Sequence, residues 1–261
     1  KEGRADAVVS AGNSGAAMAA ALLTLGRVPG VSRPAIACPL PTLKGLCVIV
    51  DAGANTDCKP EHLLQFALMG AVYVRAAFNH PRPRVGVLTI GEEEGKGNAL
   101  VVETFPLLKR LAAIEFVGNL EGRDVPVGKA DVVVCDGFVG NIVLKFAEGM
   151  GGAMVTLLRR EMTKNAVRKM VGLLFRGPLK SIKKDVDPEE YGGAPLLGVN
   201  GAVLISHGGA LPRGIRNAVR AAALLAEQKI HAEIGRVVQE EGHIIRKSGA
   251  RRGAAAGEAG A

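Results

Sequence analysis

The feature that most constrains the fold of this chain is a repeated alternation of short apolar segments with helical segments. Each apolar segment is rich in β-branched residues, and several end in a turn of Gly, Asn or Asp that opens a helical pattern. This order is typical of βαβ units, which build a largely parallel sheet. Glycine is abundant (35 residues) and aromatic residues make up only 3% of the chain, so we expect a core of small aliphatic side chains. The expected strands span residues 7–10, 46–51, 85–90, 115–118, 132–135 and 202–206.

Two longer helical patterns organise the rest of the chain. The pattern over residues 60–74 is apolar almost all round, which predicts a helix covered on both sides, as at a subunit interface. A second pattern runs from residue 137 to about 162 and leads into a basic segment that Arg176-Gly177-Pro178 interrupts. We therefore expect a single domain over residues 1–247 with a protruding helical hairpin at about 160–186. Residues 248–261 have little to bury and are expected to form a disordered tail.

The net charge of +8 is concentrated in the hairpin. Apolar residues lie beside the basic ones at helical spacing, and Leu173, Leu174 and Phe175 crowd the expected turn. Basic flanks with an apolar tip predict a segment that lies in an anionic membrane surface. The alternative is a helix face that packs on a partner; nucleic acid is disfavoured because stacking aromatics are nearly missing. The basic residues of the segment are Lys164, Arg168, Lys169, Arg176, Lys180, Lys183 and Lys184.

The sequence lacks the patterns that are typical of several classes of protein. The four cysteines show no C-x-x-C spacing, so reduced thiols in a cytosol are expected. No Cys/His grouping predicts a metal site, and no G-x-S-x-G elbow predicts a covalent nucleophile. No apolar stretch reaches the roughly 18 to 20 residues of a spanning helix, and no charged-then-apolar leader opens the chain. We therefore expect neither a membrane span nor an export signal.

Glycine-rich turns at helix starts are the first candidate binding sites, because the ligand crevice of an open α/β sheet lies at the carboxyl ends of its strands. Asn13, Ser14 and Gly15 place free backbone N–H groups at a helix start, which suits phosphate; a tight turn made for packing is the equal alternative. Lys96 and Asn98 follow an acidic turn whose three glutamates would repel phosphate. Lys96 could supply a point charge and Asn98 could orient a carbonyl, unless both are ordinary surface residues.

Two further turns carry polar side chains after an apolar strand. Asp136 and Asn141 bracket a Gly-Phe-Val-Gly turn, and Lys145, one helical turn beyond Asn141, faces the same way. Asp136 is equally interpretable as the cap of the next helix. His207 ends the expected strand over residues 202–206 and is the best placed of the five histidines.

Six sequence motifs, taken together and in this order, closely resemble the PlsX family of phosphate acyltransferases. The resemblance covers residues 5 to about 241. The motifs are Ser10-Ala-Gly-Asn-Ser-Gly-Ala16, Asp51-Ala-Gly-Ala-Asn-Thr-Asp-Cys-Lys-Pro-Glu-His62, Ile90-Gly-Glu-Glu-Glu-Gly-Lys-Gly-Asn98, Gly118-Asn-Leu-Glu-Gly-Arg-Asp124, Cys135-Asp-Gly-Phe-Val-Gly-Asn141 and Tyr191-Gly-Gly-Ala-Pro-Leu-Leu-Gly198.

The resemblance implies an α/β fold, a three-layer α/β/α sandwich related to phosphotransacetylases and isopropylmalate-type dehydrogenases. It also implies a homodimer and the production of acyl phosphate for phosphatidic acid synthesis. The family's catalytic lysine, aspartate and asparagine correspond to Lys96, Asp136 and Asn141. Its membrane-contacting element corresponds to the hairpin around residues 172–178, where Leu173, Leu174 and Phe175 are the residues expected to contact the membrane. The remaining substrate- or phosphate-binding set expected from the motifs and turns is Asn13, Ser14, Gly15, Asn55, Lys59, Asn98, Lys145 and His207.

The implied reaction passes an acyl group from acyl carrier protein to inorganic phosphate and needs no cofactor, because phosphate can attack a thioester directly once the oxyanion is bound. Lys96 would hold phosphate and Asn141 would donate to the carbonyl oxygen. Asp136 would orient one of them or act as a base. The product would feed a glycerol-3-phosphate acyltransferase that uses acyl phosphate, and the protein would lie in the cytoplasm at the inner face of the cell membrane.

Two other classes of function stay open. A phosphate acetyltransferase-like enzyme that uses acyl-CoA would share the fold but would have little use for a basic apolar hairpin. A non-catalytic scaffold at the membrane surface would explain the hairpin but not Lys96 and Asn141.

The family also begins with an Asp-Ala-Met-Gly-Gly-Asp motif that this sequence lacks, so we expect a strand and part of the phosphate pocket to lie upstream of Lys1.

Overall fold

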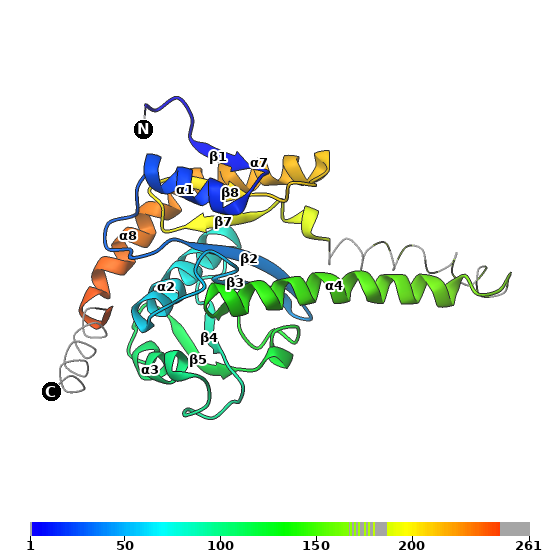
Figure 1. Cartoon of the computed structure of the whole chain (residues 1–261), viewed down its shortest axis with the longest axis horizontal. Coiled ribbons are helices and arrows are strands. Elements are labelled where there is room, and N and C mark those ends of the chain that lie inside the picture. The colour runs from blue at the N-terminus through cyan, green and yellow to red at the C-terminus, as the bar shows by residue number, and fades with distance from the viewer. Residues whose placement is uncertain are drawn as a thin grey trace.

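The computed structural model describes residues 2–166, 168, 170, 172, 175, 177, 180 and 187–245. Its strands form one sheet, and helices lie on both faces of that sheet (Figure 1). The strands are β1 (Ala7–Ser10), β2 (Ala35–Thr42), β3 (Gly45–Val50), β4 (Arg84–Leu88), β5 (Glu115–Leu120), β6 (Val132–Val134), β7 (Ala194–Leu197) and β8 (Ala202–Ile205). The helices are α1 (Ser14–Thr24), α2 (Pro60–Ala77), α3 (Ala99–Leu108), α4 (Gly137–Met162), α7 (Pro212–Glu227) and α8 (Ile230–Glu240), with the single turns η1 (Gly122–Asp124) and η2 (Pro188–Glu190).

Alternate side chains of the strands enter two different cores. On one face, residues such as Val48, Val50 and Val132 pack with α2, α3, α7 and α8. On the other face, residues such as Ile49 and Val133 pack with α1 and the beginning of α4. This alternation is the two-residue period of a strand that is buried on both sides. The predicted three-layer α/β/α architecture is therefore confirmed.

The sheet order is β1-β8-β7-β2-β3-β6-β4-β5. β1 runs parallel to β8, and β3, β6, β4 and β5 run parallel to one another. β7 is antiparallel to both β8 and β2, and β2 is antiparallel to β3. The two parallel groups consequently point in opposite directions. The turns after β1 and β8 therefore lie at one end of the strands, and the turns after β3, β4 and β6 lie at the other.

β2 was not among the expected strands, and it contains Pro39 and Pro41, a residue type that is rare in a central strand. The register shows how the sheet accommodates them. β2 pairs with β3 along its length, but β7 reaches only Ala35 and Ile36. The two prolines lie beyond the end of β7 and are two residues apart, so both can turn the side that lacks an N–H group away from β3.

α2 is covered within the chain. Its residues from His62 to Val74 are all buried, packed against the sheet, α3 and α8. The prediction that this helix lies at a subunit interface is therefore wrong, because its own chain supplies the cover on every side.

α4 has the opposite character. Only Gly137 and Gly140 are buried in it, and the helix continues beyond the sheet (Figure 1). It is long and apolar enough to cross a membrane by length and composition, which corrects the expectation that no segment reaches that length. This is weak evidence for a span, since the first turn packs tightly on the protein body and the helix carries Lys145 and Glu148. Leu173 and Leu174 of the expected hairpin tip and the tail over residues 248–261 lie outside the described residues.

Candidate active site at the ends of β3, β4 and β6

The turn after β3 is built around a buried carboxylate. Asp51 is 0% exposed and accepts hydrogen bonds from the backbone N–H groups of Ile36 (3.0 Å), Gly53 (3.2 Å), Ala54 (3.0 Å) and Asn55 (2.7 Å). The Asn55 side-chain amide donates to Asp51 Oδ2 at 2.8 Å and to the carbonyl of Pro34 at 2.7 Å. Burial raises the pKa of Asp51, and these hydrogen bonds oppose that shift. Asn55, predicted to bind substrate, is thus placed inside the turn with both donors of its amide in use.

The first turn of α4 packs on this turn with almost no space between them. The N–H of Gly137 donates to the carbonyl of Asn55 at 2.7 Å, and a Cβ added at Gly140 would meet the Asp51 carbonyl oxygen at 1.9 Å. Both glycines of the Gly-Phe-Val-Gly motif are therefore required by close approach of backbone. Asn141 follows directly, and its side chain lies against Gly53, where an added Cβ would be 3.5 Å from Asn141 Cβ.

Asp136 and Asn141 differ in how free their side chains are. Asp136 Oδ1 accepts from the N–H of Val139 at 2.9 Å, so this half-buried residue is the N-cap of α4. The capping role uses one carboxylate oxygen and leaves the other available. Asn141 is exposed on the first turns of the helix. The helix therefore presents an amide and a carboxylate at the end of β6.

The loop between β4 and α3 carries Lys96. Its glutamates are drawn aside, because Glu92 pairs with Lys129 at 2.8 Å and Glu94 pairs with Lys109. Lys96 is exposed and forms no ion pair with any residue that the structure describes. The expected repulsion of phosphate by the acidic turn is thereby reduced, since two of its charges are neutralised.

Asn98 lies at the end of the same loop and is the N-cap of α3. Its Oδ1 accepts from the N–H of Val101 at 3.0 Å, so the structure gives the Asn98 oxygen a capping role. Because β4 is the parallel neighbour of β6, the loop that carries Lys96 and the turn that carries Asp136 follow the same ends of two adjacent strands.

The second group of predicted residues lies at the opposite strand ends. Asn13 caps α1 by accepting from the N–H of Ala16 at 3.0 Å, and Ser14 and Gly15 are exposed in the first turn. His207 Nδ1 accepts from the N–H of Gly209 at 3.0 Å, next to the β1 end where Ser206 N–H donates to the carbonyl of Ser10 at 2.8 Å. These residues therefore lie at the strand ends opposite those that carry Lys96 and Asp136, because the antiparallel pairings of β2 and β7 reverse the direction of the sheet.

Lys145 lies in α4, one helical turn after Asn141. It is exposed and pairs with Glu148 at 2.8 Å. Both charges act on Cys38 of β2, whose pKa is raised to about 12 by burial first and then by Glu148. Lys145 thus lies on the part of α4 whose charges reach β2.

One functional candidate was missed from the sequence. Arg33 is exposed just before β2 and forms no ion pair with any described residue. Its charge acts on Cys58 and His62, and Asp136 acts on the same Cys58 thiol, so Arg33 faces the turn after β3. The sequence signal that could have indicated Arg33 is its position directly before Pro34 and β2. This signal could be interpreted only once residues 35–42 were known to form a strand.

Lys59 lies close to this turn as the residue before α2, and its side chain is exposed. His62 Nδ1 accepts from the backbone N–H of Lys59 at 3.1 Å, and burial lowers the pKa of His62. This imidazole is therefore a neutral cap of α2. Exposed cations at this end of the strands thus come from the Lys96 loop, the start of α2 and the segment before β2. Among the described residues, no cluster of three or more His, Cys, Asp or Glu side chains could hold a metal ion.

The fold is that of the phosphotransacetylase class. A phosphotransacetylase, EutD, from Staphylococcus aureus superposes with a TM-score of 0.54 at 16% identity over 88% of this chain, and one from Streptococcus pyogenes with a TM-score of 0.53 at 19% identity over 91%. The chain spans 64% of the length of each of these two structures.

The family is narrower than the fold. The family model described as "Fatty acid synthesis protein" matches residues 1–233. A phosphate acyltransferase of Elusimicrobium minutum is 50% identical over 97% of this chain and 74% of its own length, and one of Thermodesulfovibrio yellowstonii is 51% identical over 90% and 68%. The chain belongs to this family of acyltransferases, which confirms the resemblance found in its motifs.

Proposed function

We propose that the whole protein transfers a fatty acyl group from the thioester of acyl carrier protein to inorganic phosphate. The observation that carries the proposal is that Lys96, which forms no ion pair with a described residue, follows β4, while Asp136 and Asn141 follow β6, its parallel neighbour in the sheet. A phosphate oxygen attacks the carbonyl carbon, the tetrahedral oxyanion collapses, and the carbon–sulfur bond breaks. The products are acyl phosphate and the carrier thiolate, which takes up a proton. The acyl phosphate then acylates glycerol 3-phosphate on a downstream acyltransferase.

Each proposed role follows from an available group. Lys96 and Arg33 supply positive charge for phosphate, with Lys59 close by, and the Asn141 amide donates to the carbonyl oxygen as negative charge develops there. The free oxygen of Asp136 orients one of these groups or accepts a proton from phosphate. Direct attack is favoured over an acyl-cysteine route, because burial raises the pKa of Cys38 and of Cys58 to about 12 and keeps both as thiols.

Phosphate-dependent loss of the thioester tests this proposal in the full-length protein. Acyl carrier protein thioesters and acyl-CoA of the same chain length should be compared at equal phosphate concentration. We expect faster turnover with the carrier substrate. Faster turnover with acyl-CoA would identify a phosphotransacetylase-like enzyme instead, and no thioester loss with either substrate would leave the scaffold function.

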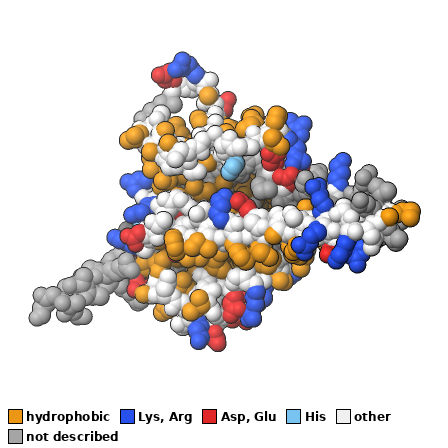
Figure 2. Space-filling model, turned by 45° about the vertical axis from the view of Figure 1, so that its right-hand side comes forward, with side chains coloured by type: hydrophobic (Ala, Val, Ile, Leu, Met, Phe, Trp, Pro, Cys, Tyr) orange, Lys and Arg blue, Asp and Glu red, His pale blue; other side chains and the backbone are white. Residues whose placement is uncertain are grey.

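We also propose that the protein forms a homodimer through the exposed face of α4. Phe138, Ile142, Phe146, Met150 and Met154 recur every four residues and are 45% to 68% exposed. Figure 2 shows hydrophobic side chains gathered in a band across the face on which α4 lies. An apolar surface of this extent is uncommon on a monomer, and a two-fold axis lets the same face cover itself. Sedimentation of the wild-type protein and a Phe146→Glu variant tests the pairing: a dimer that survives the change would contradict it.

The proposal of membrane binding is argued from the residues between the end of α4 and Phe175. Arg159 and Arg160 lie in the last turn of α4 and Lys164 follows it, and the side chains of Met170 and Phe175 are 65% and 53% exposed. We propose that this tip enters an anionic bilayer at the inner face of the cell membrane, with basic residues meeting lipid phosphates. Liposome flotation of wild type and a Leu174→Ser, Phe175→Ser variant tests it. Equal flotation of both proteins would sink the idea.

A further inference from the structure

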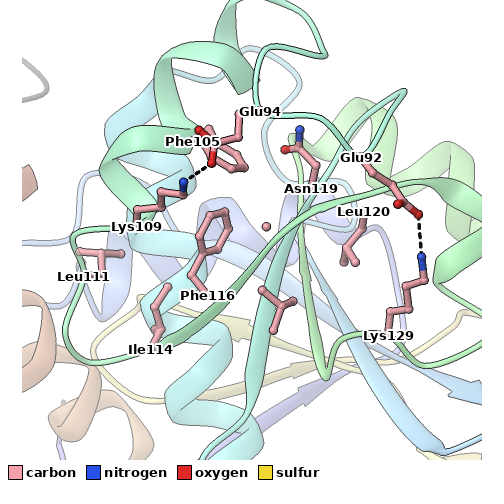
Figure 3. Close-up of a pocket in the computed structure, with 12 residues that line it drawn as sticks. Glu92, Glu94, Phe105, Lys109, Leu111, Ile114, Phe116, Asn119, Leu120 and Lys129 are labelled. Atoms are coloured by element: carbon pink, nitrogen blue, oxygen red, sulfur yellow. Dashed lines mark hydrogen bonds and ion pairs between the residues drawn. The ribbon is translucent and has the colours of Figure 1, made fainter.

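A pocket of about 630 Å³ follows β5 at the edge of the sheet (Figure 3). The five consecutive residues from Phe116 to Leu120 line it, so the strand itself forms one wall. The volume is in the range of small-molecule and cofactor sites. Glu92 and Glu94 also line the pocket, and they belong to the loop that carries Lys96. The pocket therefore adjoins the proposed active site through that loop.

The pocket has an apolar floor and a charged but balanced rim. Phe105 and Phe116 meet edge to face with ring centroids 5.3 Å apart, and Leu111 and Ile114 extend this floor. The rim carries the Lys109–Glu94 and Lys129–Glu92 ion pairs, one at each side of the space in Figure 3. Such a lining suits an amphipathic ligand better than a purely apolar or a highly charged one.

The side-chain amide of Asn119 gives the pocket wall a hydrogen-bond acceptor, its Oδ1 atom. The residue is 8% exposed, and its Nδ2 donates to the carbonyl of Glu93 at 2.6 Å. Its Oδ1 is buried and has no hydrogen-bond partner among the residues that the structure describes. Leaving a buried carbonyl unpaired costs about 1 to 3 kcal/mol. A ligand that brings an N–H or O–H donor to this wall removes that cost, whereas a plain alkyl chain cannot.

The backbone of β5 offers further hydrogen bonds. Among the strands that the structure describes, β5 pairs with β4 alone, so its outer side has no strand partner. The register shifts between Val85 and Gly86, which leaves Val117 as an extra residue, 40% exposed, followed by Gly118 at φ +96°. An open edge of this kind binds extended chains that carry their own amide groups.

We propose that this pocket binds the pantetheine arm of the thioester substrate, an inference that rests on the proposed acyl transfer. The arm is a thin chain with two amides, a hydroxyl and a gem-dimethyl group. Its amides pair with the β5 edge and donate to Asn119 Oδ1, and its methyl groups lie on the Phe105 and Phe116 rings. Lys109 and Lys129 at the rim meet the phosphate that joins the arm to its carrier. The thioester end then passes the loop toward Lys96.

The test measures binding of free pantetheine to the full-length protein by calorimetry and by amide chemical shifts. We expect shifts at Gly118 and Asn119. A Val117→Trp variant fills the pocket and should weaken binding at least about tenfold, a loss of about 1.4 kcal/mol. Val102→Trp is the matched control, because Val102 is 43% exposed on α3 and lies outside the pocket lining. If Val117→Trp fails to fold, Val117→Lys places a long side chain across the same space.

Kinetics separate this inference from the proposed reaction. The Val117 variant should raise the KM for the thioester substrate and leave the KM for phosphate unchanged. If the wild-type protein binds pantetheine but shows no turnover, the proposed reaction is wrong and the binding site stands. If Val117→Trp shows normal turnover and unchanged pantetheine binding, the proposed binding site is wrong. Dodecanoate that displaces pantetheine from the β5 edge would overturn it as well. Tighter binding of holo carrier protein than of CoA would support the site and name the carrier as the source of the arm.

Discussion

The backbone of Asp51 lies so close to Gly140 that no side chain fits between the turn after β3 and the first turn of α4. A Cβ built on Gly140 would meet the Asp51 carbonyl oxygen at 1.9 Å. Gly140→Ala should therefore force α4 away from the site and cost about 3 kcal/mol or more of unfolding free energy. Chemical denaturation measures this loss, and activity should fall with it.

Gly149→Ala is the control for that substitution, because it lies in the same helix and an added Cβ would meet nothing within 4 Å. It should stabilise the protein by about 0.5 to 1 kcal/mol, since alanine favours a helix more than glycine does. Equal losses in the two variants would show that helix propensity, not contact with Asp51, sets the effect.

Asp136 has a capping role that must be separated from a chemical one. Asp136→Asn keeps an oxygen that can accept from the N–H of Val139, whereas Asp136→Ala removes the cap. We expect Asp136→Asn to keep the wild-type Tm but to lose roughly 100-fold or more in turnover, because general acid–base groups contribute at least that much. Asp136→Ala should lose about 1 kcal/mol of stability in addition. Full activity in Asp136→Asn would reduce this residue to a helix cap.

Most of the layered fold could be predicted from the sequence because the β-branched strands and glycine turns act locally. The helix over residues 137–162 was predicted with the bounds observed, and the cap at Asp136 was one of the two interpretations of that residue. β2 and β7 could not be, since two prolines interrupt one and the other follows a pair of glycines. Those two strands set the direction of the whole sheet. The sequence therefore could not show that Asn13 and His207 lie at the other strand ends from Lys96.

The covering of α2 is also a tertiary property. An apolar surface all round a helix indicates that it is covered but not whether its own chain or a second copy supplies the cover. Here the sheet, α3 and α8 do so. Arg33 illustrates the same limit for the site, because its relation to Asp136 depends on β2 lying beside β3.

Lys96 and Asn141 should act on charge that develops during the reaction. Lys96→Ala and Asn141→Ala in the full-length protein should each lower turnover on the order of 100- to 1,000-fold, the cost of removing one oxyanion or phosphate donor. Both side chains are exposed, so Tm should change little. Near-normal turnover in both variants would remove them from the catalytic set.

Arg33 should bind phosphate before the reaction begins. Arg33→Ala is expected to raise the KM for phosphate roughly tenfold or more, since an exposed guanidinium that has no ion pair with a described residue can give phosphate a charge-assisted hydrogen bond. Arg33→Lys should recover part of this loss because it restores the charge without the bidentate geometry. Initial rates at varied phosphate and fixed thioester measure the effect. A change confined to the KM of the thioester would move Arg33 to the carrier side of the site.

The Asp131–Arg84 pair should set the acid limit of stability. Asp131 accepts from Arg84 at its backbone N–H (2.8 Å), at Nε (3.0 Å) and at Nη2 (2.9 Å), which joins β4 to the start of β6. Burial alone raises the pKa of this carboxyl, but the hydrogen bonds and charge of Arg84, with a smaller effect of His80, outweigh burial and hold the pKa below its usual range.

A depressed folded-state pKa means that the pair contributes its full stability above the ordinary aspartate value near pH 4 and loses it as pH falls through the lower folded value. Asp131→Asn should cost about 2 kcal/mol at pH 7, where the wild type is fully paired, and less at pH 3. Urea unfolding at both pH values measures the difference. Glu115→Gln is the control, since this exposed carboxylate lies at the paired position in β5 and forms no ion pair with a described residue. An identical deficit of Asp131→Asn at pH 7 and pH 3 would show that packing, not ionisation of Asp131, accounts for its contribution.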